Sequence, residues 1–367
     1  MKFTCDRDVL IKEITTAQEV ISSRNALSIL SNVLLQNEDN TLTIRATDLK
    51  VSFETKLPID TLESGSTTVF CDKFLGILRS MPTGIATFEE KTNGTFFIRN
   101  RDGSIDFKLK SIESSKFPEI QVLSNDHFFH FPQRDFIEMV SQTVFAVSDD
   151  ETRYFMNGVY MEKNGDQLVM VATDGRRLSF IGTRPEVDTP DFPGVIVPPK
   201  ILNMVKKLAS GEGTLQIAVH EKTMYIIFEN QRLTSTLIEG TFPNYRRVIP
   251  ESQDHKILVQ KHDFEEALKR VSLLVEKSHR IYLDIQGDAL TIRSEENEFG
   301  VAKETIPCQF QGDEITIALN YRYLADPLRV MDCKEIEIQF TEANKALTIF
   351  SIPHDNYKHI VMPMQLD

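Results

Sequence analysis

The tripeptide Ala46-Thr47-Asp48 recurs as Ala172-Thr173-Asp174, and the repetition around it decides how this chain is divided. Ahead of it, Asn32-Val33-Leu34-Leu35 corresponds to Asn157-Gly158-Val159-Tyr160. The two copies lie about 125 residues apart. Repeats of 20–50 residues are typical of solenoids and propellers, whereas this period has the size of a globular domain.

Further matches extend the repeat to the whole chain. Asp8, Asp135 and Asp263 each stand near the start of a helix-like apolar pattern, at spacings of 127 and 128 residues. Phe117-Pro118 recurs as Phe242-Pro243, and Pro363 stands near where a third copy would close. The sequence therefore predicts three tandem domains, covering residues 1–124, 125–251 and 252–367.

Each domain contains two halves with the order strand, helix, several strands. In the first half, Leu10, Ile14, Ala17 and Ile21 form an apolar stripe that predicts a helix over residues 8–21. Strands are predicted at 32–36, 41–46 and 51–58, and the second half gives a helix over 72–80. Single helices among antiparallel hairpins indicate an α+β fold, with two helices packed on antiparallel sheets in each domain.

Local signals predict where later helices begin. Asp135 and Asp263 are each followed three residues later by Glu, which predicts a capping box with the Asp as N-cap. Pro199 is expected at the first position of another helix.

The composition indicates a cytoplasmic protein. Hydrophobic residues make up 41% and charged residues 26%, as in ordinary globular domains. No apolar run reaches membrane-spanning length, and the N-terminal residues show no signal-peptide pattern. Four isolated cysteines indicate neither a disulfide framework nor a zinc site, and they suit a reducing compartment.

Charge is unevenly distributed between predicted helices and the rest of the chain. The net charge is −13, which argues against a simple basic nucleic-acid binder. The predicted helices, counted over residues 7–22, 72–80, 133–148, 199–208, 262–280 and 321–334, together carry a net +3, so −16 remains for strands and loops. This contrast favours a relatively basic helical face that meets a polyanion. The simpler interpretation is that the helices merely carry many lysines on solvent-exposed faces.

No motif indicates catalysis. His127 and His130 are a weak metal pair, and Gly211-Glu212-Gly213 lacks the setting of a dinucleotide fold. Asp48 and Asp174 recur in equivalent places, which indicates a shared turn in which Asp bonds its own backbone. We therefore expect no enzyme, no metal and no cofactor.

Three stretches carry a resemblance to a known family: Ala172–Leu178, Phe242–Val248 and Val361–Met364. Together they resemble the bacterial β sliding clamps, the processivity subunits of DNA polymerase III, over the whole chain. The resemblance implies three domains of the DNA-clamp fold, two chains closing head to tail into a six-domain ring, and helices lining its channel. Duplex DNA would be held without sequence recognition.

The resemblance also implies three groups of site residues. The DNA-facing residues would be Arg24, Arg153, Tyr154, Lys200 and Lys206. A pocket for short peptides of the replicative DNA polymerase, the clamp loader and other clamp-binding proteins would comprise Met156, Thr173, Gly175, Arg176, Arg177, Leu178, Pro243, Val248, Asn320, Tyr323, Val361, Met362, Pro363 and Met364. The homodimer seam would comprise Lys73, Phe107 and Leu109 of the first domain and Leu273, Glu298 and Glu304 of the third.

Two other functions compete with a DNA clamp. A repeat scaffold would bind peptides without encircling DNA. A nuclease built on Asp48 and Asp174 ranks far behind, because the Asp residues are better explained by a turn.

Overall fold

The computed structural model describes residues 1–21, 29–91, 94–121, 123, 127–184, 190–354 and 356–365. The chain forms two compact units: Met1–His130 with Thr214–Thr236, and Phe131–Gly213 with Leu237–Asp367. In the described residues, no helix has the length and apolar character needed to cross a membrane.

The first unit holds α1 and α2 and most of a long antiparallel sheet, in the order β15-β16-β17-β4-β3-β2-β6-β9-β8-β7-β1-β5. Its elements are β1 (Lys2–Asp6), α1 (Arg7–Val20), β2 (Asn32–Glu38), β3 (Thr41–Thr47), β4 (Val51–Pro58), β5 (Asp60–Glu63), β6 (Gly65–Phe70), α2 (Cys71–Ser80), β7 (Ile85–Lys91), β8 (Thr95–Asn100), β9 (Asp106–Ile112), β15 (Thr214–His220), β16 (Thr223–Phe228) and β17 (Gln231–Thr236). Strand β10 (Phe129–Pro132) runs across the boundary to the second unit.

In its described residues, the second unit holds the α-helices α3, α4, α5 and α6 and two sheets, ordered β14-β11-β12-β13-β26-β25-β24-β18-β22 and β21-β20-β19-β23. Its elements are α3 (Gln133–Ser141), β11 (Val159–Asn164), β12 (Gln167–Thr173), β13 (Arg177–Thr183), β14 (Val195–Val197), α4 (Pro199–Leu208), β18 (His255–Gln260), α5 (Lys261–Val271), β19 (Arg280–Gln286), β20 (Ala289–Ser294), β21 (Lys303–Pro307), β22 (Gln309–Phe310), β23 (Ile315–Asn320), α6 (Tyr321–Leu328), β24 (Glu335–Phe340), β25 (Leu347–Ile352) and β26 (Tyr357–Val361). Short 3-10 helices include η4 (Val144–Ala146) and η5 (Glu151–Met156).

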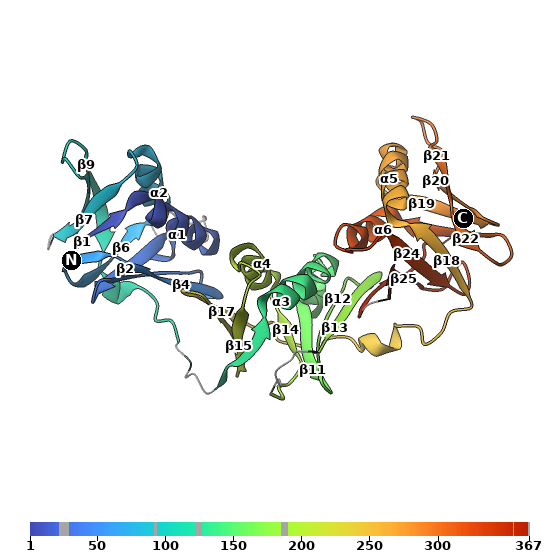
Figure 1. The fold of residues 1–367 in the computed structure, drawn as a ribbon, viewed down its shortest axis with the longest axis horizontal. Helices are drawn as coiled ribbons and strands as arrows, with labels where there is room; N and C mark the ends of the chain where they lie inside the picture. The colour runs from blue at the N-terminus through green and yellow to red at the C-terminus, as the bar shows by residue number, and fades with distance from the viewer. Residues whose placement is uncertain are drawn as a thin grey trace. The chain divides into compact units, whose positions relative to one another are not determined.

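The helices lie in pairs: α1 beside α2, α3 beside α4, and α5 beside α6 (Figure 1). Each pair turns an apolar stripe toward strands, and in α1 the predicted Leu10, Ile14 and Ala17 are completely buried. Phe74 of α2 stands edge-on to Phe88 and Phe96, with ring centroids 6.0 and 5.7 Å apart. The predicted α+β fold with two helices per repeat is therefore confirmed.

The predicted starts of α3 and α5 were wrong. These helices begin at Gln133 and Lys261, so Asp135 and Asp263 lie inside the first turn and cap nothing with their side chains. An acid there still interacts favourably with the helix dipole, which explains why the sequence pattern resembled a cap. Pro199 does open α4 as predicted.

Two strand pairs join successive repeats into continuous sheets. In the first unit, β17 pairs antiparallel with β4, placing Leu233 opposite Phe53. In the second unit, β26 pairs antiparallel with β13, placing His359 opposite Ser179. In both cases the third strand after the second helix of one repeat meets the third strand after the first helix of the preceding repeat.

Candidate functional site

The repeated Ala-Thr-Asp tripeptide forms the same turn twice. Asp48 Oδ1 accepts from the backbone N–H groups of Lys50 and Val51 at 2.9 and 2.7 Å. Asp174 Oδ1 accepts from the N–H groups of Arg176 and Arg177 at 2.9 and 3.0 Å. The prediction of a shared turn is confirmed, and both carboxylates are occupied by backbone donors.

The turn after β12 brings β13 against the C-terminal segment. Thr173 Oγ1 donates to the carbonyl of Arg177 at 2.6 Å, and Met362 N–H donates to the carbonyl of Arg176 at 2.8 Å. Further along, Met364 N–H donates to the carbonyl of Ala318 in β23 at 2.8 Å. The tail thus lies between the first half of the second repeat and the second half of the third.

Most of the predicted partner-pocket residues meet along this joint. Leu178 packs in a buried cluster with Phe242, Tyr245 and Ile360, and Ile249 and Ala346 cover the cluster in part. Met156, Thr173 and Val361 are buried; Arg177, Pro243, Asn320, Tyr323, Pro363 and Met364 are half-buried; Gly175, Arg176, Val248 and Met362 are exposed. Val248, whose N–H donates to the carbonyl of Tyr245 in this cluster, and Met362, two residues after Ile360, are thus exposed apolar residues beside a buried apolar cluster, which suits an apolar ligand.

Arg177 is the most tightly held residue at this joint. Its Nε donates to Asp174 at 3.2 Å, Nη1 to Asp326 of α6 at 2.6 Å, and Nη2 to the carbonyl of Phe145 at 2.7 Å. The guanidinium also lies 4.7 Å from the ring centroid of Tyr323 and 5.5 Å from that of Phe145. Its side chain is only 10% exposed.

Buried polar residues behind Arg177 continue the joint. Ser179 Oγ donates to the carbonyl of Gln142 at 2.5 Å, and His359 Nε2 donates to the carbonyl of Tyr323 at 3.0 Å. Burial, and secondarily the positive charge of Arg177, lower the pKa of His359 to about 3. His359 is therefore neutral at ordinary pH.

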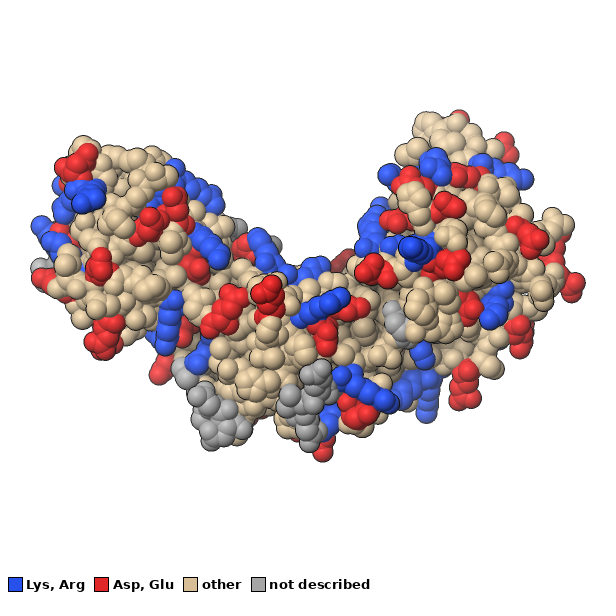
Figure 2. Space-filling view, in the orientation of Figure 1, with Lys and Arg blue, Asp and Glu red and all other residues tan. Residues whose placement is uncertain are grey.

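The predicted DNA-facing residues lie on η5 and α4, except for Arg24, which lies outside the described residues. Arg153 Nε donates to Asp150 at 2.9 Å, so part of its charge is already compensated, and Tyr154 is exposed. On α4, Lys206 is exposed and Lys200 is half-buried. On the face drawn in Figure 2, basic and acidic side chains are interspersed over both units.

The predicted seam residues lie on strands, helices and loops of the first and third repeats. Phe107 and Leu109 stand on β9, and Leu273, which is 81% exposed, follows α5. Lys73 of α2 and Glu298 are exposed, whereas Glu304 of β21 makes a bidentate ion pair with Arg270 at 2.7 and 2.9 Å.

Sequence reasoning missed two seam candidates, Phe299 and Val301, which are 73% and 54% exposed. They flank Gly300, whose φ is +125°. A turn glycine between two large apolar residues is a sequence signal that could have drawn attention to this loop.

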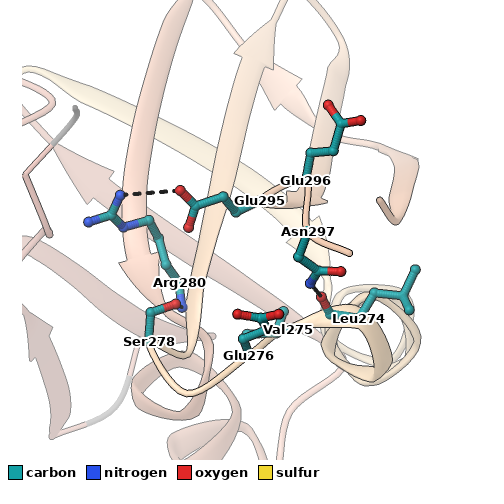
Figure 3. Close-up of a pocket in the computed structure, with 8 residues that line it drawn as sticks. All are labelled: Leu274, Val275, Glu276, Ser278, Arg280, Glu295, Glu296 and Asn297. Atoms are coloured by element: carbon teal, nitrogen blue, oxygen red, sulfur yellow. Dashed lines mark hydrogen bonds and ion pairs between the residues drawn. The ribbon is translucent and has the colours of Figure 1, made fainter. Parts of the chain in front are cut away.

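A small cavity lies beside the same loop (Figure 3). Its volume is about 60 Å³, and Glu276, Ser278, Arg280 and Glu295 are among its lining residues. Arg280 pairs with Glu295 at 3.8 Å. A cavity of this size is far below that of usual small-molecule sites. Within the described ranges, no group of three or more His, Cys, Asp or Glu side chains could hold a metal ion.

Comparisons with known proteins agree along the whole chain. Models of the N-terminal, central and C-terminal domains of the DNA polymerase III beta subunit match residues 1–121, 130–244 and 246–365. The Beta sliding clamp of Treponema pallidum is 43% identical, and that of Escherichia coli K12 is 28% identical, each over 100% of both chains.

Solved structures show the same likeness. The DNA polymerase III subunit beta of Borrelia burgdorferi, solved with a natural product, superposes with a TM-score of 0.94 at 26% identity and complete coverage of both chains. The Pseudomonas aeruginosa sliding clamp bound to griselimycin gives a TM-score of 0.94 at 28% identity, also with complete coverage. The chain belongs to the DNA polymerase III beta subunit family, the bacterial β sliding clamps.

Proposed function

We propose that this chain is a sliding clamp, in which two copies close head to tail around duplex DNA and tether the replicative polymerase. It acts by topological linkage and positioning and performs no catalysis. The observation that carries the proposal is the repeated strand pairing between successive repeats. We also propose that the protein acts in the cytoplasm. Its domain boundaries are placed between residues 124 and 125 and between residues 251 and 252.

The two observed joints follow one rule that predicts a third. Strands β4, β13 and β21 are each the third strand after the first helix of a repeat, and β9, β17 and β26 are each the third strand after the second helix. β17 pairs with β4 and β26 pairs with β13. β21 is an edge strand, and residues 106–110 of β9 pair only with β8 on one side. An unpaired edge favours association, so β21 of one copy is the natural partner of β9 of another.

The register of this third joint follows from equivalent positions in β4, β13 and β21. The hairpins β2–β3, β11–β12 and β19–β20 all close with two-residue turns, after Glu38, Asn164 and Gln286. Ala46, Ala172 and Ser294 lie at the same distance after these turns, and the residues opposite them in the next strand, Phe53, Ser179 and Ala302, are therefore equivalent. Ser294 N–H donates to the carbonyl of Ala302 at 2.9 Å, which confirms that these two residues lie opposite each other.

The opposite strands are aligned through the helix starts. The first N–H of α1, α3 and α5 donates to the carbonyls of Gly84, Gly213 and Lys334, respectively. Residues at the same distance after these carbonyls can be followed to their paired residues across the next two strands. They lead to Phe107, Leu233 and His359, which are therefore equivalent positions.

Because Leu233 faces Phe53 and His359 faces Ser179, we expect Phe107 to face Ala302 of the second copy. In an antiparallel ladder this register also sets Asp106 opposite Lys303 and Lys108 opposite Val301. The pairing thus juxtaposes opposite charges and places Phe107 close to the exposed Phe299–Val301 loop.

The proposed ring would hold DNA through flexible, mainly cationic side chains. It would hold partner proteins at the tail joint, the contact between the second and third repeats along which the C-terminal segment lies. Lys206, Lys200, Arg153, Tyr154 and Arg24 are the proposed DNA contacts, which attract phosphates without reading sequence. Short apolar peptides of the polymerase, the clamp loader and other partners would bind over Val248 and Met362. Flexible methionines let one surface accept many sequences.

Retention on DNA tests the proposal directly. After loading onto nicked circular DNA, the protein should stay bound through gel filtration and leave when the circle is linearised. Equal retention on circular and linear DNA would exclude encirclement.

A peptide-binding scaffold is the alternative, favoured only by the exposed apolar residues of the joint. It predicts no difference between circles and linear DNA, and no loss of function in an Arg24→Ala, Lys200→Ala double variant.

A further inference from the structure

We infer that Arg177 is a positioning residue, which fixes α6 of the third repeat against the turn of the second repeat and does not itself contact a bound peptide. The inference rests on the proposed partner surface and changes the role that family resemblance assigns to this residue.

The donors of Arg177 are directed into the chain. A guanidinium has five N–H donors in a rigid planar fork. In Arg177 all three nitrogens donate to acceptors of the chain: Asp174, Asp326 and the carbonyl of Phe145. The rings of Phe145 and Tyr323 lie near its planar group, and 10% exposure leaves little surface for a ligand. Bidentate recognition of a peptide carboxylate would require breaking these bonds.

The three acceptors come from separate parts of the second unit. Asp174 belongs to the turn before β13, Phe145 to η4, and Asp326 to α6. Arg177 therefore sets the spacing between Thr173 of the turn, whose hydroxyl bonds the Arg177 carbonyl, and Tyr323 on α6. Both residues belong to the proposed partner surface, on opposite sides of the joint. Lysine could not substitute, because its ammonium is a point charge without the planar fork.

Asp326 provides the test, since it bonds Arg177 from α6. We would compare Arg177→Met, Asp326→Ala, their double variant and Asp326→Asn in the full chain. Arg329→Met is the matched control, because Arg329 contacts Asp326 at 3.4 Å from a side chain that is 69% exposed. The probe is griselimycin, found bound to the Pseudomonas aeruginosa clamp. Hydrogen exchange of residues 321–328 reports directly on the placement of α6.

A positioning role predicts coupled losses. Arg177→Met and Asp326→Ala should each weaken griselimycin binding at least tenfold and speed exchange in α6. The double variant should bind no more weakly than the weaker-binding single variant. Asp326→Asn, which keeps an acceptor oxygen, should restore binding to within threefold, and Arg329→Met should match the wild type.

Two results would overturn the inference. If Asp326→Ala left griselimycin binding unchanged while Arg177→Met weakened it, Arg177 would be a direct ligand contact. Unchanged α6 exchange in Arg177→Met would remove the positioning role, whatever happened to binding. If the wild type failed to bind griselimycin, the proposed partner surface would lose its support, while α6 exchange would still decide the role of Arg177.

Discussion

At the scale of single residues, the joint between the second and third repeats depends on polar side chains that are fully buried. His359 is completely buried, bonds the carbonyl of Tyr323 and lies 3.4 Å from Ser179 Oγ. Buried polar groups specify one arrangement only when each has a partner. Here they fix which strand face meets which helix, so a general apolar contact would not replace them.

His359 makes the stability of this joint depend on pH. Its pKa is lowered to about 3 in the folded chain from 6.5, so below pH 6.5 the unfolded chain binds a proton that the folded chain excludes. The stabilisation is therefore complete above pH 6.5 and is lost as the pH falls toward 3. The loss is about 1.4 kcal/mol per pH unit, or about 2 kcal/mol between pH 6.5 and 5.

Urea unfolding of the second unit at several pH values checks this prediction. His359→Gln should remove this loss of unfolding free energy with falling pH, while His130→Gln, at an exposed position, should retain it. Identical slopes in both variants would show that His359 does not control the acid response.

At the scale of elements, the repeated Ala-Thr-Asp turn has a different residue at its left-handed position in the first and second repeats. Leu49 adopts φ +74° where the equivalent Gly175 adopts φ +87°. A side chain in the left-handed region costs about 1–2 kcal/mol, whereas glycine is free of that cost. Leu49 is 64% exposed, so little packing offsets the cost.

Leu49→Gly should therefore stabilise the first unit. After subtracting the extra entropy of an unfolded glycine, we expect a gain of about 0.5 kcal/mol in the free energy of unfolding. Gly175→Ala should have the opposite sign, because a side chain is strained at its φ of +87°; the tip of Arg153, 2.9 Å from the new Cβ, can move aside. Chemical denaturation of both variants is the measurement, and a destabilised Leu49→Gly chain would contradict it.

Helix α4 carries the clearest excess of positive charge, with Lys200, Lys206 and Lys207 and no acid. If Lys206 contacts a phosphate, Lys206→Ala should reduce the slope of log affinity against log salt by up to about 0.9 on duplex DNA. Lys56→Ala removes an exposed lysine from strand β4 instead and should leave the slope unchanged. Equal effects of both variants would mean that DNA binding senses only total charge.

The sequence predicted elements better than their ends and contacts. The stripe of Leu10, Ile14 and Ala17 and the turn at Asp174 were predictable, because periodicity and Asx turns are local properties. The start of α3 was missed, because a backbone bond between Gln133 and Gly213 sets it, 80 residues apart. The ion pair of Arg177 with Asp326 spans 149 residues and left no local signal.

At the scale of the whole molecule, strand pairing between repeats accounts for the proposed ring, and the joint between the second and third repeats differs from the others. Two internal joints share one strand register, and the edge strand β21 and the unpaired side of residues 106–110 of β9 would complete the series with a second copy. The tail joint differs from the others by its exposed Val248 and Met362 and by the buried polar network around Arg177. The proposed partner surface thus lies where the repeat is least regular.

Disulfide trapping at the predicted seam tests the ring most directly. In a Cys333→Ser background, cysteines at Asp106 and Lys303 should form intermolecular disulfides, because directly opposed strand residues lie about 4.5–5.5 Å apart. Cysteines at Lys108 and Lys303, one diagonal step out of register, should not, because about 7–8 Å separates them. Covalent dimers from the first pair alone would support the ring. Trapping by the offset pair alone would refute the register, and a chain that stays monomeric with neither pair trapped would contradict the ring itself.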